Sequence, residues 1–262
     1  MKNMYEEKEI KISKKYLQEV ITSLKEPVVI LGGWATYFLV NDRYKEVTGR
    51  TYVGSRDIDI GFHIEEQVDL ASTSFAHSYH MLTKRMGFRP LGFRLFKETH
   101  VDTGEELSSD RAKNLPSYMI FPVYVDMVVD MITSRFREYF GFTPIDEPLL
   151  ASVFNDENNR VEVKEFGRRL WLPVPELLLS MKIKSCLNRA KEHKRVKDIC
   201  DITVLLLFST EDLNRVGGQI GKILNRETIA GFNSELSNQD IMSASDIIGI
   251  DVSVIKNVLS KI

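Results

Sequence analysis

Apolar residues recur at helical spacing near the N-terminus and then give way to short runs of β-branched residues. Between residues 8 and 25 the apolar positions fall three or four apart, which predicts one amphipathic helix. The next run, residues 28–31 (VVIL), is continuous and stops at a double glycine at 32 and 33, so it predicts a buried strand entering a tight turn. We expect a helix over 34–40 after this turn, followed by a loop over 43–54.

Alternation of polar and apolar residues predicts further strands. Residues 57–62 (DIDIGF) place carboxylates on one face and isoleucines on the other, as in a half-buried strand. Residues 88–99 predict a hairpin, and residues 118–132 predict either one strong strand or two strands broken at Pro122. A second hairpin is expected over 161–172.

From residue 176 onward the pattern changes to a run of helices that lasts to the C-terminus. We therefore predict an α/β fold, with a mixed sheet flanked by helices, and a C-terminal helical lobe. The α/β lobe is expected to cover residues 1–172 and the helical lobe residues 173–262. A chain of 262 residues is long enough to bury the core that such an arrangement needs.

Composition narrows the class of protein. The formal net charge is −2, so the chain as a whole is not a general nucleic-acid binder, although local basic clusters remain open to a polyanion. The N-terminus is charged and has no apolar signal segment, and no apolar stretch is long enough to span a bilayer. The two cysteines form no CxxC pair. We expect a reduced, cytoplasmic protein without a membrane partner.

Asp57 and Asp59 are the sharpest candidates for chemistry. Residues two apart on a strand point to the same side, with Cβ atoms roughly 6–7 Å apart. Two such carboxylates can share Mg²⁺, which favours oxygen ligands together with substrate phosphates. An aspartate pair by itself is also the ordinary polar face of a strand. The earlier double glycine favours the metal interpretation, because it lets the backbone approach a ligand and presents helix-start N–H groups to an anion.

The order of strand, double glycine, helix and a strand with Asp-x-Asp resembles the nucleotidyltransferase superfamily and its polymerase β-like members. The matching residues are Gly32, Gly33, Ser55, Arg56, Asp57 and Asp59. The resemblance implies that the glycine turn cradles a nucleoside triphosphate, with Ser55 and Arg56 nearby, and that the two aspartates hold Mg²⁺, or Mn²⁺ in its place. One departure is the long gap between the two motifs, which we interpret as an insertion over 44–54.

The superfamily also has a third carboxylate on a neighbouring strand. Asp126 and Asp130 each lie in a Val-Asp-Met sequence and fit this role. Four residues apart on one strand, both face the same side, yet they are too far apart to be equivalent. Asp130 is the preferred candidate, as a further metal ligand or as the group that receives the hydroxyl proton, and Asp126 is the alternative.

A second group of charged residues lies in the predicted helical lobe. Its members are Lys182, Lys184, Arg189, Asp198 and Asp201. By spacing alone they are an ordinary charged helix surface, on which Asp198 and Asp201 are neighbours three residues apart. Their order resembles that of the AbiEii/MenT-type nucleotidyltransferases, known chiefly from toxin–antitoxin and phage-defence systems. The resemblance implies that Lys182, with Lys184 in reserve, neutralises triphosphate charge and that the two aspartates support catalysis.

The function implied by both resemblances is transfer of an NMP group from an NTP to an acceptor hydroxyl. The expected partners are the nucleoside triphosphate, an RNA or tRNA end as acceptor, and a cognate antitoxin. Two alternatives stay open. One is a small-molecule nucleotidyltransferase of the antibiotic-modifying type, and the other is a catalytically silent nucleotide-binding partner protein.

Overall fold

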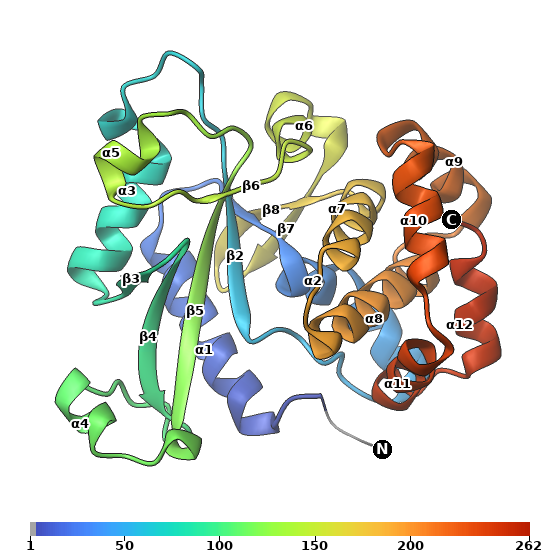
Figure 1. Cartoon of the computed structure of the whole chain (residues 1–262), viewed down its shortest axis with the longest axis horizontal. Helices are drawn as coiled ribbons and strands as arrows, with labels where there is room; N and C mark the ends of the chain where they lie inside the picture. Colours follow the sequence, from blue (N-terminus) through green and yellow to red (C-terminus); the bar gives the residue numbers. More distant parts are fainter. Residues whose placement is uncertain (1–3) are drawn as a thin grey trace. The chain divides into compact units, whose positions relative to one another are not determined.

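The computed structural model describes residues 4–262 and divides the chain into two compact units (Figure 1). The first, here called the sheet unit, comprises Tyr5–Trp34 and Ser55–Leu172. The second, the helical unit, comprises Ala35–Gly54 and Pro173–Ile262, together with residue 4. Residues 35–54, which lie within the α/β lobe expected from the sequence, group with the helices, and residues 1–3 of that lobe lie outside the described part.

Within residues 4–262, eight strands form one sheet in the order β3-β4-β5-β2-β1-β8-β7, with β6 paired to β5. The strands are β1 (Val28–Ile30), β2 (Asp57–Phe62), β3 (Arg89–Leu91), β4 (Arg94–His100), β5 (Ile120–Val129), β6 (Ile145–Asp146), β7 (Arg160–Glu165) and β8 (Arg168–Pro173). β2 and β5 are parallel, whereas β4 and β5 are antiparallel. The predicted α/β class with a mixed sheet is therefore confirmed. For residues 118–132 the sequence predicted either one strand or two strands broken at Pro122. One strand is confirmed, because β5 continues through Pro122.

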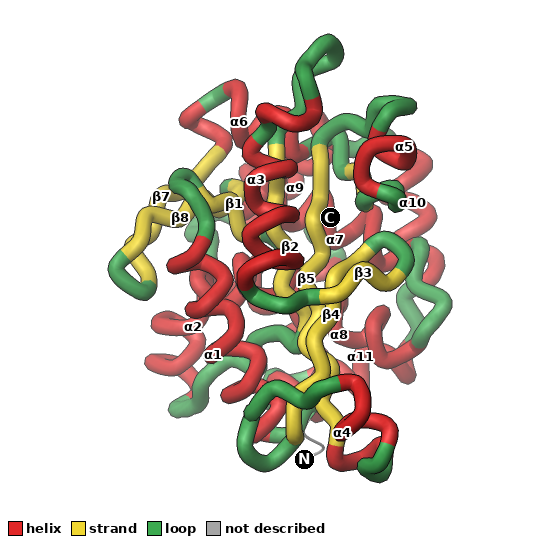
Figure 2. Tube along the Cα trace, turned by 90° about the vertical axis from the view of Figure 1, so that its left-hand side faces the viewer, coloured by secondary structure: helices red, strands yellow, loops and turns green. Residues whose placement is uncertain are grey.

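The two faces of the central strands differ in polarity. On β2, Ile58 and Ile60 are fully buried, and alternate residues of β5 from Phe121 to Val129 are buried on the same side. The helices α1 (Glu7–Ser23) and α3 (Ser74–His80) lie against the sheet (Figure 2), and Phe75 of α3 contacts Phe62 edge-on at 5.3 Å between ring centroids. The opposite face carries the aspartates.

The shorter helical segments of the sheet unit connect its strands. They are η1 (Leu70–Ser72), η2 (Met81–Arg85), α4 (Ser109–Lys113), η3 (Ser117–Met119), α5 (Phe136–Phe140), α6 (Leu150–Asn155) and η4 (Glu157–Asn159).

Helix α2 (Gly32–Thr48) begins at the double glycine and is longer than the sequence indicates. The expected loop over 43–54 is wrong for its first six residues, which are helical. Tyr44 explains the difference, because its ring packs edge-on against Tyr52 and Phe208 and its hydroxyl donates to the carbonyl of Ile248 at 2.7 Å. These contacts come from residues distant in sequence and stabilise a segment whose local composition is polar.

Six further helices build the helical unit. They are α7 (Pro175–Leu187), α8 (Glu192–Phe208), α9 (Leu213–Ile223), α10 (Arg226–Glu235), α11 (Asn238–Ile248) and α12 (Val252–Leu259). α8 packs against α7, α11 and α12, so its side chains from Val196 to Leu206 are buried all round, including charged ones. Within the described residues, none of the helices is both long enough and apolar enough to cross a membrane.

Candidate functional site

The glycine turn and the aspartate pair lie in direct contact in the sheet unit. Gly32 has a φ of +62°, and a Cβ built on it would lie 1.9 Å from Oδ2 of Asp59. The backbone N–H of Leu31 donates to the Asp59 carbonyl at 3.0 Å, which fixes the turn beside β2. Only glycine meets both demands, since it tolerates the left-handed conformation and leaves room for the carboxylate. The structure thus brings these two predicted elements together.

Asp126 joins the pair through the register of the sheet. β2 and β5 run parallel, with Asp59 opposite Asp126 and Asp57 opposite Tyr124. Neighbouring strands lie about 4.8 Å apart, so Asp126 is the carboxylate one strand away from Asp59 on the same face. Asp126 is 4% exposed, whereas Asp57 and Asp59 are half-buried. We call Asp57, Asp59 and Asp126 the acidic face.

Arg94 is the cation that meets the acidic face. It lies opposite Asp126 in the β4–β5 ladder, and its Nη2 atom is 2.6 Å from Oδ2 of Asp126 and 3.7 Å from Oδ2 of Asp57. Among the described residues, neither Nε of Arg94 nor Oδ1 of Asp126 has a hydrogen-bond partner, although both atoms are buried. Sequence reasoning missed Arg94, because its position opposite Asp126 depends on a strand register that the sequence does not reveal.

The electrostatics of the acidic face favour an added cation. Burial raises the pKa of Asp126 to about 7, and the charges of Asp59 and Asp57 add to the rise, while Arg94 opposes it. The pKa of Arg94 is raised as well. Burial lowers its pKa, but Asp126 and Asp57 outweigh that effect and raise it. At Asp126, Arg94 therefore does not offset the combined effect of burial and the two neighbouring carboxylates.

The residues of the acidic face fit Mg²⁺ with its substrate better than a metal held by protein alone. Among residues 4–262, no three His, Cys, Asp or Glu side chains converge into a ready-made metal cage. Mg²⁺ does not need one, since proteins usually hold it through one or two carboxylates and the phosphates of the substrate, with waters completing the octahedron. The buried, unpartnered Oδ1 of Asp126 is a further oxygen ligand of the type that Mg²⁺ prefers.

Asp130, the preferred third carboxylate of the sequence analysis, has different surroundings. It follows the end of β5, where its Oδ1 accepts from the backbone N–H of Ile64 at 2.9 Å and its Oδ2 contacts Nδ1 of His63. Four residues of strand separate it from Asp126, a distance of about 13 Å. The structure does not bring Asp130 to the glycine turn.

Of the two residues before the aspartate pair, Arg56 is held away from the acidic face. Ser55 is buried, at 9% exposure. The Arg56 guanidinium lies 4.9 Å from the ring centroid of Phe121 and 3.3 Å from Glu9, and the Phe121 side chain lies on the opposite face of β5 from Asp126. Arg56 therefore points to the α1 side of the sheet.

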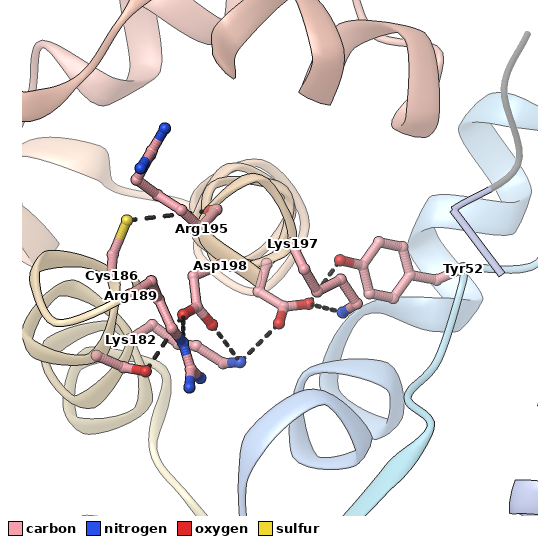
Figure 3. Close-up of polar contacts among 9 residues, drawn as sticks. Tyr52, Lys182, Cys186, Arg189, Arg195, Lys197 and Asp198 are labelled. Atoms are coloured by element: carbon pink, nitrogen blue, oxygen red, sulfur yellow. Dashed lines mark hydrogen bonds and ion pairs between the residues drawn. The ribbon is translucent and has the colours of Figure 1, made fainter. Parts of the chain in front are cut away.

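The second predicted group forms one buried ionic cluster in the helical unit (Figure 3). Nζ of Lys182 lies 3.0 Å from Asp198 and 2.7 Å from Asp201, so one lysine links both aspartates. Arg189 completes the pairing of Asp198 at 2.8 Å, and Lys197 that of Asp201 at 2.5 Å. The structure thus brings together Lys182, Arg189, Asp198 and Asp201, and it adds Lys197, which the motif does not include.

Tyr52 extends this cluster, since its hydroxyl donates to Oδ1 of Asp201 at 2.6 Å. Burial raises the pKa of Tyr52 well above its ordinary value, and the charge of Asp201 adds to the rise. Tyr52 lies in the long interval between the two motifs, and no signal in the sequence marks it. Lys184 is half-buried and lies about 200° around the axis of α7 from Lys182, so it points elsewhere.

Each buried charge of the ionic cluster has partners of the opposite sign. Burial lowers the pKa of Lys182, but Asp198 and Asp201 outweigh it and leave the pKa raised. Burial likewise raises the pKa of Asp198, but Lys182 and Arg189 outweigh it and leave the pKa lowered. Three cations face two aspartates, and Arg189, with 35% of its side chain exposed, is the one that reaches solvent.

Comparison with known proteins adds one structural likeness. No family model matches the chain, and no curated protein matches it significantly. The crystal structure of an antigenic nucleotidyltransferase-like protein from Paracoccidioides brasiliensis is similar over 92% of each chain, with 16% sequence identity and a TM-score of 0.43. A likeness at this level carries no conclusion about what the chain does.

Proposed function

We propose that the protein is a Mg²⁺-dependent nucleotidyltransferase that moves an NMP group from an NTP to an acceptor hydroxyl. The observation that carries the proposal is the acidic face, where Asp59 contacts the glycine turn and lies in register with Asp126 on the next strand. Its three neighbouring carboxylates, and the helix N-terminus that Asp59 contacts, suit a substrate that brings both phosphates and a cation.

The glycine turn, the aspartate pair and Asp126 have separate roles in this reaction. The Gly32-Gly33 turn at the start of α2 binds the triphosphate, because backbone N–H groups at a helix N-terminus favour anions. Asp57 and Asp59 hold Mg²⁺, which when bound supplies charge neutralisation and alignment of the phosphates. Asp126 receives the proton of the acceptor hydroxyl, because it is the carboxylate opposite Asp59 on the neighbouring strand.

The register supports Asp126 over Asp130 as the third carboxylate. Asp126 is opposite Asp59 and shares Arg94 with Asp57, whereas both oxygens of Asp130 are engaged by His63 and Ile64. We therefore assign Asp130 a structural role at the end of β5.

For the ionic cluster we propose a structural role. A triphosphate contact by Lys182 would require this lysine to leave two aspartates that are buried with it, at the cost of two unpaired charges. Lys182 therefore joins α7 to α8, and Asp198 and Asp201 position it. Arg189 forms the exposed end of the cluster, where it pairs with Asp198.

As acceptor we propose an RNA end, such as that of tRNA, in line with the resemblance to AbiEii/MenT-type enzymes. The test is incubation with each α-labelled NTP, Mg²⁺ and total RNA, followed by sizing of the labelled product. Label should enter RNA with the native chain and with Asp130→Asn, but not with Asp126→Asn. Label in a small product would indicate a small-molecule acceptor instead, and NTP binding without pyrophosphate release would indicate a silent partner protein.

A further inference from the structure

Two rows of side chains cross the sheet on the side that carries the aspartates, and they lead away from the acidic face. The paired strands β4 and β5 extend side by side in Figure 1, and the registers of the ladders that join β2, β5, β4 and β3 align their residues. The first row is Asp59, Asp126, Arg94 and Leu91, and the second row is Asp57, Tyr124, Phe96 and Arg89. The acidic face is thus continuous with a surface of aromatic and arginine side chains.

The planar groups of these rows lie against one another. The Arg94 guanidinium is 4.5 Å from the ring centroid of Tyr124 and 5.1 Å from that of Phe93, and the Arg89 guanidinium is 4.6 Å from that of Phe96. Tyr124 and Phe96 are half-buried, and Phe93 is 47% exposed. Unpaired nucleobases stack on aromatic rings and on arginine planes of this kind.

The arginines of this surface are held in place before any ligand arrives. Arg89 contacts Glu98 and donates to Oγ of Ser109 at 2.5 Å, and Arg94 is fixed by Asp126. Such anchoring lowers the entropy lost when a ligand stacks on them. With 41% of its side chain exposed, Arg89 also presents N–H groups to solvent at the far end of the second row.

The order of the strands separates this surface from the triphosphate. The glycine turn follows β1, on one side of β2, whereas β5, β4 and β3 succeed one another on the other side. With strands about 4.8 Å apart, Phe96 lies about 10 Å and Arg89 about 14 Å across the sheet from Asp57. This span is too long for the single base of an NTP held at the glycine turn, and it suits consecutive nucleotides of a strand.

We propose that this surface binds the unpaired nucleotides at the end of a nucleic-acid acceptor. Bases next to the terminal nucleotide stack on Tyr124 and Phe96, and Arg89 meets the backbone phosphate beyond them. The position of the terminal hydroxyl at Asp126 rests on the proposed transfer reaction. The binding of the nucleic-acid strand to this surface does not depend on that reaction. The stacking groups read no base edge, so we expect little sequence preference.

Binding of a fluorescein-labelled single-stranded RNA of mixed sequence tests the proposal by anisotropy, without NTP. Mg²⁺ is included because the carboxylates of the acidic face repel a polyanion. Phe96→Leu and Tyr124→Leu should each raise the Kd by about tenfold, the scale of one lost base stack, whereas Phe96→Tyr and Tyr124→Phe should bind like the native chain. Tyr139→Leu is the matched control, since this tyrosine is 47% exposed on α5, away from the rows.

The possible outcomes test the binding surface separately from the proposed transfer reaction. Weakened binding in the two leucine variants but not in Tyr139→Leu, with a duplex of the same sequence bound less tightly, supports the surface even if no nucleotide is ever transferred. Unchanged Kd in both leucine variants, or no binding of RNA to the native chain, overturns it. A loss of NTP binding with RNA binding intact would place the base of the NTP here and would also overturn it.

Discussion

Replacing Asp126 by asparagine tests the charge balance of the acidic face directly. The substitution keeps the size of the side chain and removes one of three neighbouring carboxylates. Asp126 is buried, with its side chain 6% exposed, so its ionisation state bears on the stability of the fold as well as on the site. We expect the sign of the stability change to depend on pH.

The magnitude follows from the pKa of Asp126 in the folded chain, about 7 instead of the ordinary 3.8. Between these two values the folded state holds a proton that the unfolded state has lost. The free energy of unfolding therefore falls as the pH rises, by about 1.4 kcal/mol for each pH unit well below the folded pKa, or about 2 kcal/mol between pH 5 and pH 7. Above the folded pKa the slope disappears. The asparagine variant lacks this contribution, so its stability relative to the native chain should rise by about 3 kcal/mol from pH 5 to pH 8.

Urea unfolding of both proteins at intervals from pH 5 to pH 8 measures this difference. Asp110→Asn is a suitable control, because Asp110 is 93% exposed and its substitution should leave the difference flat. If the difference in unfolding free energy between Asp126→Asn and the native chain stayed constant from pH 5 to pH 8, the crowding of carboxylates on this face would be refuted. With Mg²⁺ and NTP, the native chain should also release about one proton at pH 6, detectable by calorimetry in two buffers, and the variant should release none.

Three further predictions concern single positions. Asp57→Asn and Asp59→Asn should each lower Mg²⁺-dependent transfer at least about a hundredfold with the fold intact, and activity within a few-fold of native in either would remove the metal assignment. Gly32→Ala and Gly92→Ala share a positive φ near +60°, and each should lose about 1–2 kcal/mol of stability from backbone strain. Only Gly32→Ala also drives a Cβ into Asp59, so it should lose more stability than Gly92→Ala and should lose transfer. Equal transfer activities in the two variants would exclude this close approach. Lys182→Met should lower the free energy of unfolding by about 3–5 kcal/mol, because two buried aspartates lose their shared cation, and unchanged urea midpoints would show that this pair is not formed.

The sequence predicted those parts of the site that depend on local order. Asp57 and Asp59 share a face because side chains alternate along any strand, and the glycine turn followed from the break between a β-branched run and a helix. The hairpins at 88–99 and 161–172 were also local patterns, and they correspond to β3–β4 and β7–β8. Such contacts join residues that are close in sequence, so residue type and the spacing of apolar positions are enough to predict them.

The remaining parts depend on pairing between distant segments. Asp126 and Asp130 are indistinguishable in a Val-Asp-Met context, and only the alignment of β5 with β2 sets Asp126 beside Asp59. Arg94 needs a second register, that of β4 with β5. Tyr52 needs the packing of residues 35–54 with the helices, which no pattern within that segment reveals. A shift of one residue in either ladder would turn these side chains to the other face, so a sequence without pairing information cannot decide among them.

Asp126 and Asp198 show how buried charge distinguishes a site from a structural cluster. Both are nearly inaccessible, and burial raises the pKa of each. At Asp198 two cations outweigh burial, its pKa falls, and the ionised form is stable without any ligand. At Asp126 a single arginine fails to do so, since two further carboxylates act against it, and the pKa rises. Burying a carboxylate that the protein itself does not neutralise costs stability, and a neutral side chain in its place would avoid that cost. This cost is the one that the proposed binding of Mg²⁺ with an NTP would relieve.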